Sequence, residues 1–232
     1  MYDFGKAMFA IVAVPVLSLA LSGCGGPAML DHTTAIQIHS IEMVGPPQRP
    51  YLVIGSGAVV TFILAGPILG AVIANANART DFDGKMNELN VHVADELRQS
   101  ISDALRKNGI EVTQNVVERF GANLLFSYSD MGKNSDAILH ATLISDYVFD
   151  GVFSSRLAPL VTFQVRLVDA KTHKALFSKE YVYGVTSPTF PSDPRYTFAD
   201  GKSLESNPEL AGEGLRASIP LFTAQLQKDL GR

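Results

Sequence analysis

Alternating apolar and polar residues dominate the second half of the chain. Residues 137–149 place apolar side chains on one face and polar ones, His140 among them, on the other. Residues 161–167 repeat this alternation, and the polar turn 169–174 leads into a third alternating run at 175–183. We expect these three strands to form an antiparallel meander with one face in contact with water.

Helical periodicity replaces this alternation earlier in the chain. Apolar residues recur there at steps of three and four, which places them on one side of a helix. They are Met86, Leu89, Val93, Leu97, Ile101 and Leu105. We expect one long helix from about Thr80 to Asn108, with Gly109 at the C′ position that ends it. Residues 33–44 are rich in β-branched side chains and predict a strand before this helix.

A second helical pattern closes the chain. It begins at Asn207, with Pro208 at the first helical position, and Pro220 should kink or split it near Arg216. Between the two helical patterns, residues 110–113 predict a short strand and residues 116–128 a helix interrupted near Gly121. The order is therefore strand, apolar segment, helix, strand, helix, three strands and helix. This order predicts an α+β fold, in which a small mixed or antiparallel sheet has its helices packed on one face.

The N-terminus carries a segment of a different kind. Residues 7–21 are uncharged and mainly apolar, a length that fits a cleaved signal peptide and is short for a transmembrane helix. The segment ends in Leu21-Ser22-Gly23-Cys24. These residues resemble the lipobox of bacterial lipoproteins. The resemblance implies that the signal peptidase recognises Leu21, Ser22 and Gly23 and cuts before Cys24. Cys24 would then carry the lipid, including palmitate, that anchors the mature chain to a membrane.

This resemblance sets the expected domain organisation and location. Residues 1–23 are the signal peptide, 24–32 a lipidated tether and 33–232 a single periplasmic α+β domain. Gly25 follows the cysteine, whereas an Asp at that position in lipoproteins favours retention in the inner membrane. The resemblance therefore implies a lipid anchor in the outer membrane, with the domain on its periplasmic side. Cys24 is the only cysteine, so no intramolecular disulfide can form.

Three patterns in the domain point to envelope proteins. Residues 107–112 end the long predicted helix, and 136–139 open a long alternating strand. Both resemble the periplasmic domains of the curli-secretion lipoprotein and of the lipoprotein activators of penicillin-binding proteins. The tail, residues 194–198 with the helix after Asn207, is similar to a group of uncharacterised proteobacterial outer-membrane lipoproteins. These resemblances imply a small α/β domain and bring no specific activity.

The stretch 50–78 contains 29 residues without a charge, enough to span a bilayer as a helix. Small residues recur every four positions in it and form a candidate helix-contact stripe. They are Gly66, Gly70, Ala74 and Ala78. Pro67 and the β-branched run 59–63 oppose one continuous helix. The stretch is therefore either buried, in the domain or in an oligomer, or inserted into a membrane, and both interpretations stay open.

Residues with catalytic chemistry do not form a recognisable motif. The five histidines lack the HxxxH and HExxH spacings, so we expect no metal and no cofactor beyond the lipid on Cys24. No nucleophile elbow, Walker motif or dinucleotide fingerprint is present, and we expect no enzyme. The formal net charge of −4 gives no reason to expect a nucleic-acid partner.

The leading functional hypothesis is a non-enzymatic, lipid-anchored envelope lipoprotein that binds or scaffolds other components. Its partner would be another envelope protein or a second copy of the chain. The alternative is a membrane-inserting oligomer that acts as a secretion or pore component, built around residues 50–78.

Overall fold

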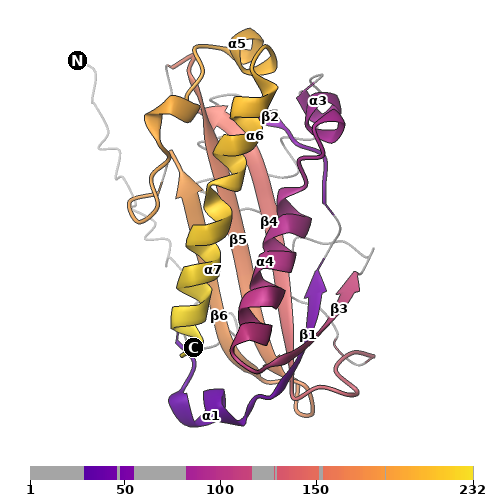
Figure 1. The fold of residues 1–232 in the computed structure, drawn as a ribbon. Helices are drawn as coiled ribbons and strands as arrows, with labels where there is room; N and C mark the ends of the chain where they lie inside the picture. Colours follow the sequence, from indigo (N-terminus) through magenta and orange to yellow (C-terminus); the bar gives the residue numbers. More distant parts are fainter. Residues whose placement is uncertain are drawn as a thin grey trace, which may run out of the picture.

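The computed structural model describes residues 29–45, 48–54, 82–116, 128, 130–151, 154–185 and 187–231. Its centre is a mixed sheet in the order β3-β1-β4-β5-β6, with β2 pairing with β4 beyond the end of β1 (Figure 1). The strands are β1 (Ser40–Gly45), β2 (Val53–Ile54), β3 (Glu111–Val116), β4 (Ala137–Phe149), β5 (Leu157–Asp169) and β6 (Ala175–Gly184). β1 is parallel to both of its neighbours, whereas β4, β5 and β6 are antiparallel to one another.

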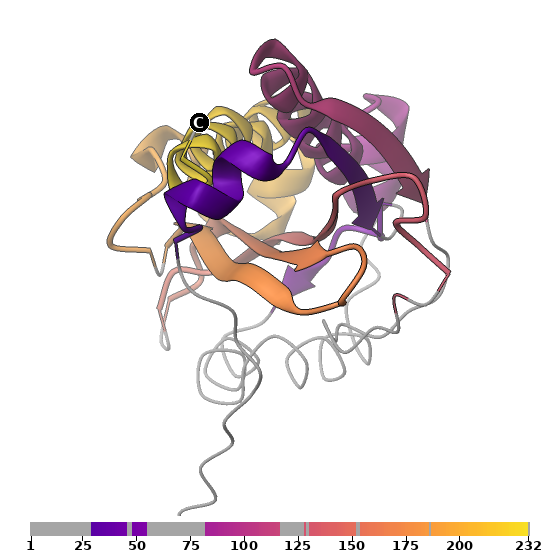
Figure 2. The same cartoon turned by 90° about the horizontal axis from the view of Figure 1, so that it is seen from below.

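The longer helices cover one face of this sheet. The helical segments are α1 (His32–Gln37), α3 (Phe82–Glu88), α4 (Val93–Lys107), η1 (Pro194–Tyr196), α5 (Gly201–Glu205), α6 (Pro208–Arg216) and α7 (Ser218–Asp229). Figures 1 and 2 show α4 beside α6 and α7, all on the same side of the strands. The predicted α+β fold, with a mixed sheet and helices on one face, is therefore confirmed.

The predicted meander is confirmed in its strands but not in its wet face. β4 has the predicted bounds, and Ala137, Leu139 and Tyr147 face the helices in the main core. The opposite face of β4 is buried towards both ends and half-buried in the middle, at Thr142 and Ile144. A second cluster of Ile138, Val168 and Tyr128 packs on one end of it. His140 lies on this second face and is only 5% exposed, so its expected contact with water is wrong.

The long helix predicted for residues 80–108 is two helices. α3 ends at Glu88, and Asn90 adopts a left-handed conformation with φ +51°. The N–H of Val91 then bonds to the carbonyl of Met86, and that of Asn90 to Asn87, which is a Schellman ending. α4 ends in the same way at Gly109, as predicted, with φ +80°. The apolar stripe crosses the break at Asn90, and this continuity is why periodicity alone misses it.

The predicted strand at residues 33–44 is a short helix followed by a strand. Asp31 caps α1 by accepting the N–H of Thr34 at 3.0 Å, and β1 begins only at Ser40. The local cap therefore overrides the β propensity of the Thr and Ile residues. At the other end of the chain the predicted break is confirmed, since α6 ends at Arg216 and α7 starts at Ser218.

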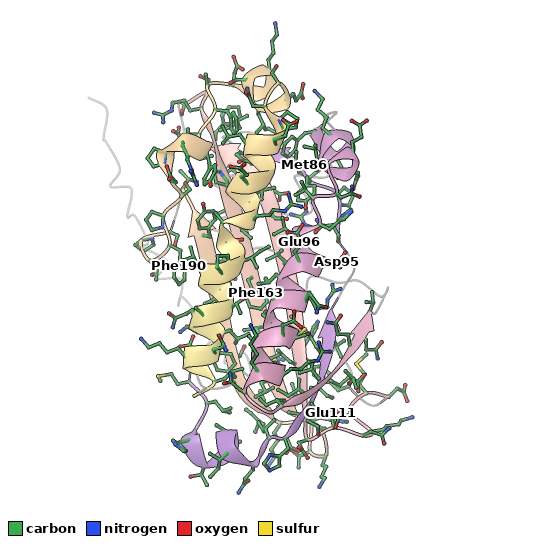
Figure 3. All side chains as sticks on the ribbon, viewed as in Figure 1. Met86, Asp95, Glu96, Glu111, Phe163 and Phe190 are labelled. Atoms are coloured by element: carbon green, nitrogen blue, oxygen red, sulfur yellow. The ribbon has the colours of Figure 1, made fainter. Side chains whose placement is uncertain are left out.

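The aromatic residues of the second half belong mainly to the core. Phe163 of β5 stacks on Phe222 of α7, with ring centroids 5.8 Å apart. Phe190, from the irregular segment after β6, meets the same Phe222 ring edge-on at 6.0 Å. Figure 3 shows Phe163 behind the helices and Phe190 beside them. The helix layer and the segment after β6 are thus packed together around one aromatic side chain.

Candidate functional site

The site residues predicted from the sequence fall outside the described residues. These are Leu21, Ser22, Gly23 and Cys24 of the lipobox and Gly66, Gly70, Ala74 and Ala78 of the candidate stripe. Lipidation and the helix contact therefore stay predictions. In the part of the chain that the structure describes, no helix is both long and apolar enough to cross a membrane.

The structure describes the residues on either side of the segment 55–81. Tyr51, just before β2, donates its backbone N–H to the carboxylate of Asp83 in α3 at 2.8 Å. The rings of Tyr51 and Phe82 also meet, with centroids 6.3 Å apart. The start of β2 and the start of α3 therefore lie side by side, although 30 residues separate Tyr51 from Phe82 in the sequence.

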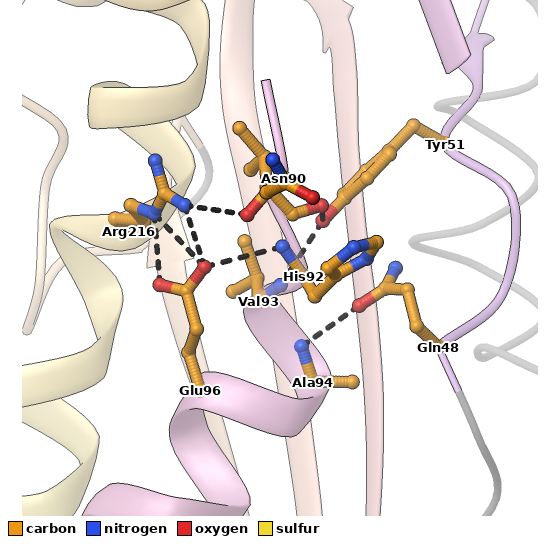
Figure 4. A network of polar contacts seen from close by, with 9 residues as sticks. Gln48, Tyr51, Asn90, His92, Val93, Ala94, Glu96 and Arg216 are labelled. Atoms are coloured by element: carbon orange, nitrogen blue, oxygen red, sulfur yellow. Dashed lines mark hydrogen bonds and ion pairs between the residues drawn. The ribbon is translucent and has the colours of Figure 1, made fainter. Parts of the chain in front are cut away.

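Tyr51 also belongs to a polar network at the start of α4 (Figure 4). Its buried hydroxyl donates to the carbonyl of Val91 at 2.9 Å and accepts the N–H of Val93 at 3.0 Å. Gln48 accepts the next N–H, that of Ala94, at 2.8 Å. Side chains from a distant segment thus satisfy backbone groups that a helix start leaves unpaired. Burial raises the pKa of Tyr51, which keeps its hydroxyl protonated and able to donate.

Glu96 connects this network to α6. Arg216 donates to both oxygens of its carboxylate, from Nε at 2.8 and 3.0 Å and from Nη2 at 2.7 Å, and the N–H of His92 donates to it at 3.1 Å. Arg216 also donates to the carbonyl of Asn90 at 2.9 Å. Burial opposes ionisation of Glu96, but the hydrogen bonds from Arg216 and His92 outweigh it and lower the pKa of this carboxyl. The network therefore joins α3, α4, α6 and the segment before β2 into one junction.

A buried acid, Asp146, lies on β4 between the residues that pair with β1 and those that pair with β2. Asp146, 2% exposed in its side chain, forms an ion pair with Arg49 and accepts the N–H of Leu52 at 3.0 Å. Burial raises the pKa of Asp146, and the nearby Arg49 charge opposes this rise. β5 pairs with β4 along its other edge, but on this edge no strand pairs with β4 at Asp146, so these bonds are what hold residues 49–52 against β4 there.

His140 is the other buried titratable group of note. Its Nδ1 lies 3.1 Å from the hydroxyl of Tyr128, and Arg166 is its cross-strand neighbour. Burial and the Arg166 charge lower the pKa of His140 to about 4, so it is neutral at physiological pH. Within the described ranges, no group of three or more His, Cys, Asp or Glu residues is placed to hold a metal ion.

The far end of the sheet, at α1, is where the described chain begins. Leu30 donates its N–H to the carbonyl of Asp229 at the end of α7, and Ala35 of α1 is buried. Two large apolar side chains stay exposed there, Met29 at 63% and Ile36 at 54%. Ala137 of β4 pairs with β1 near this end and Tyr147 pairs with β2. Ten residues of strand thus separate α1 from the junction, about 33 Å.

No known protein family matches this chain, and neither does any curated protein. Solved structures similar to it include protein XCC0632 from Xanthomonas campestris, with 12% identity and a TM-score of 0.37 over 82% of this chain and 88% of that one. Lipoprotein GNA1162 from Neisseria meningitidis has 15% identity and a TM-score of 0.29 over 62% and 81%. The PelC dodecamer from Paraburkholderia phytofirmans has 12% identity and a TM-score of 0.30 over 89% and 92%. At these low scores the similarities carry no conclusion about activity or partners.

Proposed function

We propose that this chain is a lipid-anchored envelope lipoprotein whose domain binds or scaffolds other envelope components from the periplasmic side of the outer membrane. The lipobox at Leu21-Ser22-Gly23-Cys24 supports the anchor. The domain works by binding and not by catalysis, either to another envelope protein or to a second copy of itself. No cofactor takes part other than the covalent lipid on Cys24.

The observation that favours a binding role over a pore is where the described residues on either side of 55–81 lie. Tyr51 and Asp83 are hydrogen-bonded to each other at the end of the sheet opposite α1 (Figure 1). The lipid anchor connects to the α1 end, because Met29 lies five residues after Cys24. The two features that suggest membrane contact are therefore connected to opposite ends of the described domain. A pore built on residues 50–78 would place the stretch and the anchor in the same bilayer.

Processing in cells tests the anchor. We expect the wild-type protein to incorporate a palmitate analogue and to fractionate with membranes. Cys24→Ser should abolish the label and leave a precursor heavier than the mature form, because lipidation precedes cleavage in lipoproteins. An unlabelled wild-type protein of mature size would overturn the proposal.

The outer-membrane location has its own test. Gly25→Asp should shift the protein to inner-membrane fractions, whereas the same change one residue later, Gly26→Asp, should leave it in the outer membrane. The second variant controls for the added charge. Inner-membrane recovery of the wild type, or an equal shift in both variants, contradicts the proposed location.

The scaffold role predicts a stable neighbour. Mild cross-linking of intact envelopes should give a discrete adduct of the lipidated protein, either with a second copy or with another envelope protein. Cys24→Ser should reduce that adduct, because the anchor concentrates the domain at the membrane. A protein that stays monomeric on the membrane at every cross-linker dose contradicts the scaffold role.

A further inference from the structure

The covalent chain limits how far the α1 end can be from the anchored membrane. Met29 is the first described residue, and it lies five positions after Cys24. Even fully extended, five residues span roughly 18 Å. If Cys24 is lipidated, α1 must therefore lie at or close to the bilayer surface.

The α1 end of the domain carries exposed apolar side chains, from Met29 just before α1 and from Ile36 within it. Four large apolar side chains within the described residues are exposed, and the two most exposed are Met29 and Ile36. Val116 and Leu221, the other two, lie at the end of β3 and on α7. The most exposed apolar surface of the described domain thus coincides with the end that the anchor reaches.

This apolar end is held in a fixed orientation. Asp31 accepts both the backbone N–H and the hydroxyl of Thr34, at 3.0 and 3.2 Å, so the first turn of α1 is capped. The bond from Leu30 to Asp229, 3.2 Å long, ties the start of α1 to the end of α7. Ala35 is only 2% exposed, so one side of α1 is packed against the domain. Ile36 therefore projects from a supported helix and not from a loose tail.

We propose that Met29 and Ile36 dock into the lipid bilayer that holds the anchor, so that the domain stands with α1 on the membrane and α3 and α5 pointing away from it. This inference rests on the proposed lipidation of Cys24. Two side chains alone would bind a bilayer weakly, but the lipid makes their contact intramolecular and gives it a high effective concentration. The docked end sets which surface of the domain faces the periplasm.

Site-specific fluorescence on the lipidated protein tests this orientation. Lipidation blocks the sulfur of Cys24, the only natural cysteine, so an introduced cysteine is the single free thiol. An environment-sensitive fluorophore is attached to Ile36→Cys, and to Lys202→Cys as the control on exposed α5. Each protein is reconstituted into vesicles of phosphatidylethanolamine and phosphatidylglycerol, with and without a quencher on the lipid acyl chains.

We expect strong quenching and a blue-shifted emission at residue 36, and neither at residue 202. Equal signals at both positions, or quenching at 202 alone, overturn the docking. A second set carries the fluorophore on exposed Gln37→Cys, with and without Met29→Ser and Ile36→Ser. The serine changes should remove the quenching while the protein stays on the vesicles; unchanged quenching also overturns the docking.

Failure of the anchor itself gives a different result. If Cys24 carries no lipid, its thiol reacts with the fluorophore in the protein without an introduced cysteine, and the protein does not incorporate into vesicles. That outcome rejects the proposed function along with the docking. Incorporation without quenching at residue 36 rejects the docking alone.

Discussion

At the scale of single residues, the buried hydroxyl of Tyr51 has the clearest structural role. It accepts the N–H of Val93 and donates to the carbonyl of Val91, and both of these residues are buried, at 0% and 1% exposure. Tyr51→Phe should therefore lower the free energy of unfolding by about 1–3 kcal/mol, the cost of leaving buried polar groups unpaired. Denaturant titration followed by circular dichroism measures this change.

Tyr196→Phe is the matched control for Tyr51→Phe. Its hydroxyl also accepts a hydrogen bond, but from the exposed side chain of Arg195. Because the Arg195 side chain is exposed, water can accept its hydrogen bond once the hydroxyl is gone, and we expect a change within roughly 0.5 kcal/mol. Equal losses in the two variants would contradict the role assigned to the junction at α4.

The neutral, buried His140 makes stability depend on pH. Its pKa is about 4 in the folded protein and 6.5 in the unfolded chain. Between these values the unfolded chain binds a proton that the folded protein does not, so unfolding becomes easier as the pH falls from 6.5 towards 4. This difference in pKa corresponds to a decrease in the free energy of unfolding on the order of 3 kcal/mol between pH 6.5 and pH 4.

Unfolding measured at several pH values tests the assignment to His140. In His140→Gln the decrease in the free energy of unfolding between pH 6.5 and 4 should be much smaller than in the wild type. His173→Asn, at an exposed turn position with φ +56°, should keep the wild-type profile. A wild-type slope that persists in His140→Gln would mean that other groups cause the pH dependence.

At the scale of elements, the sequence predicts a strand well when its own side-chain alternation defines it. The bounds of β4 follow from alternation alone, and the pair of β5 and β6 follows from the polar turn between them. The burial of the second face of β4 is not encoded in that strand. It depends on Tyr128 and on Leu52, which reach β4 through the tertiary fold.

The break between α3 and α4 shows the same limit. Leu89 and Val93 keep the helical spacing across the break, so the stripe indicates one helix. Asn90 was the signal available, since Asn is the residue after Gly that most readily adopts a left-handed conformation. The junction that fixes the break was beyond sequence reasoning, because Tyr51 and Arg216 meet α4 from 42 and 120 residues away.

Substitutions at Asn90 test this account of the break. Asn90→Gly should keep or slightly raise the melting temperature, because glycine adopts φ +51° without strain. Asn90→Ala should cost about 1 kcal/mol for forcing a Cβ into the left-handed region. Gly109→Ala, where an added Cβ meets no atom within 4 Å, should cost about the same for the same reason. A neutral Asn90→Ala would contradict the left-handed ending of α3.

At the scale of the whole molecule, α1 lies at one end of the sheet, and β2 and α3, which flank residues 55–81, lie at the other. If α1 rests on the membrane with the strands upright, β2 and α3 lie about 33 Å above it. Residues 55–81 number 27, and extended chain would use about 20 of them to reach that membrane and return. About seven would remain, fewer than the roughly 9–11 that even a membrane-spanning strand needs. A docked α1 and a pore in the same bilayer therefore exclude each other.

The lipidated cysteine is the premise that joins the anchor, the orientation of the domain and the proposed binding role. The most direct measurement is the mass of the N-terminal peptide of the protein purified from membranes. We expect this peptide to begin at Cys24 and to carry acyl chains on the cysteine sulfur and amino group. A peptide that begins at Met1, or one in which Cys24 keeps a free thiol, would contradict this expectation.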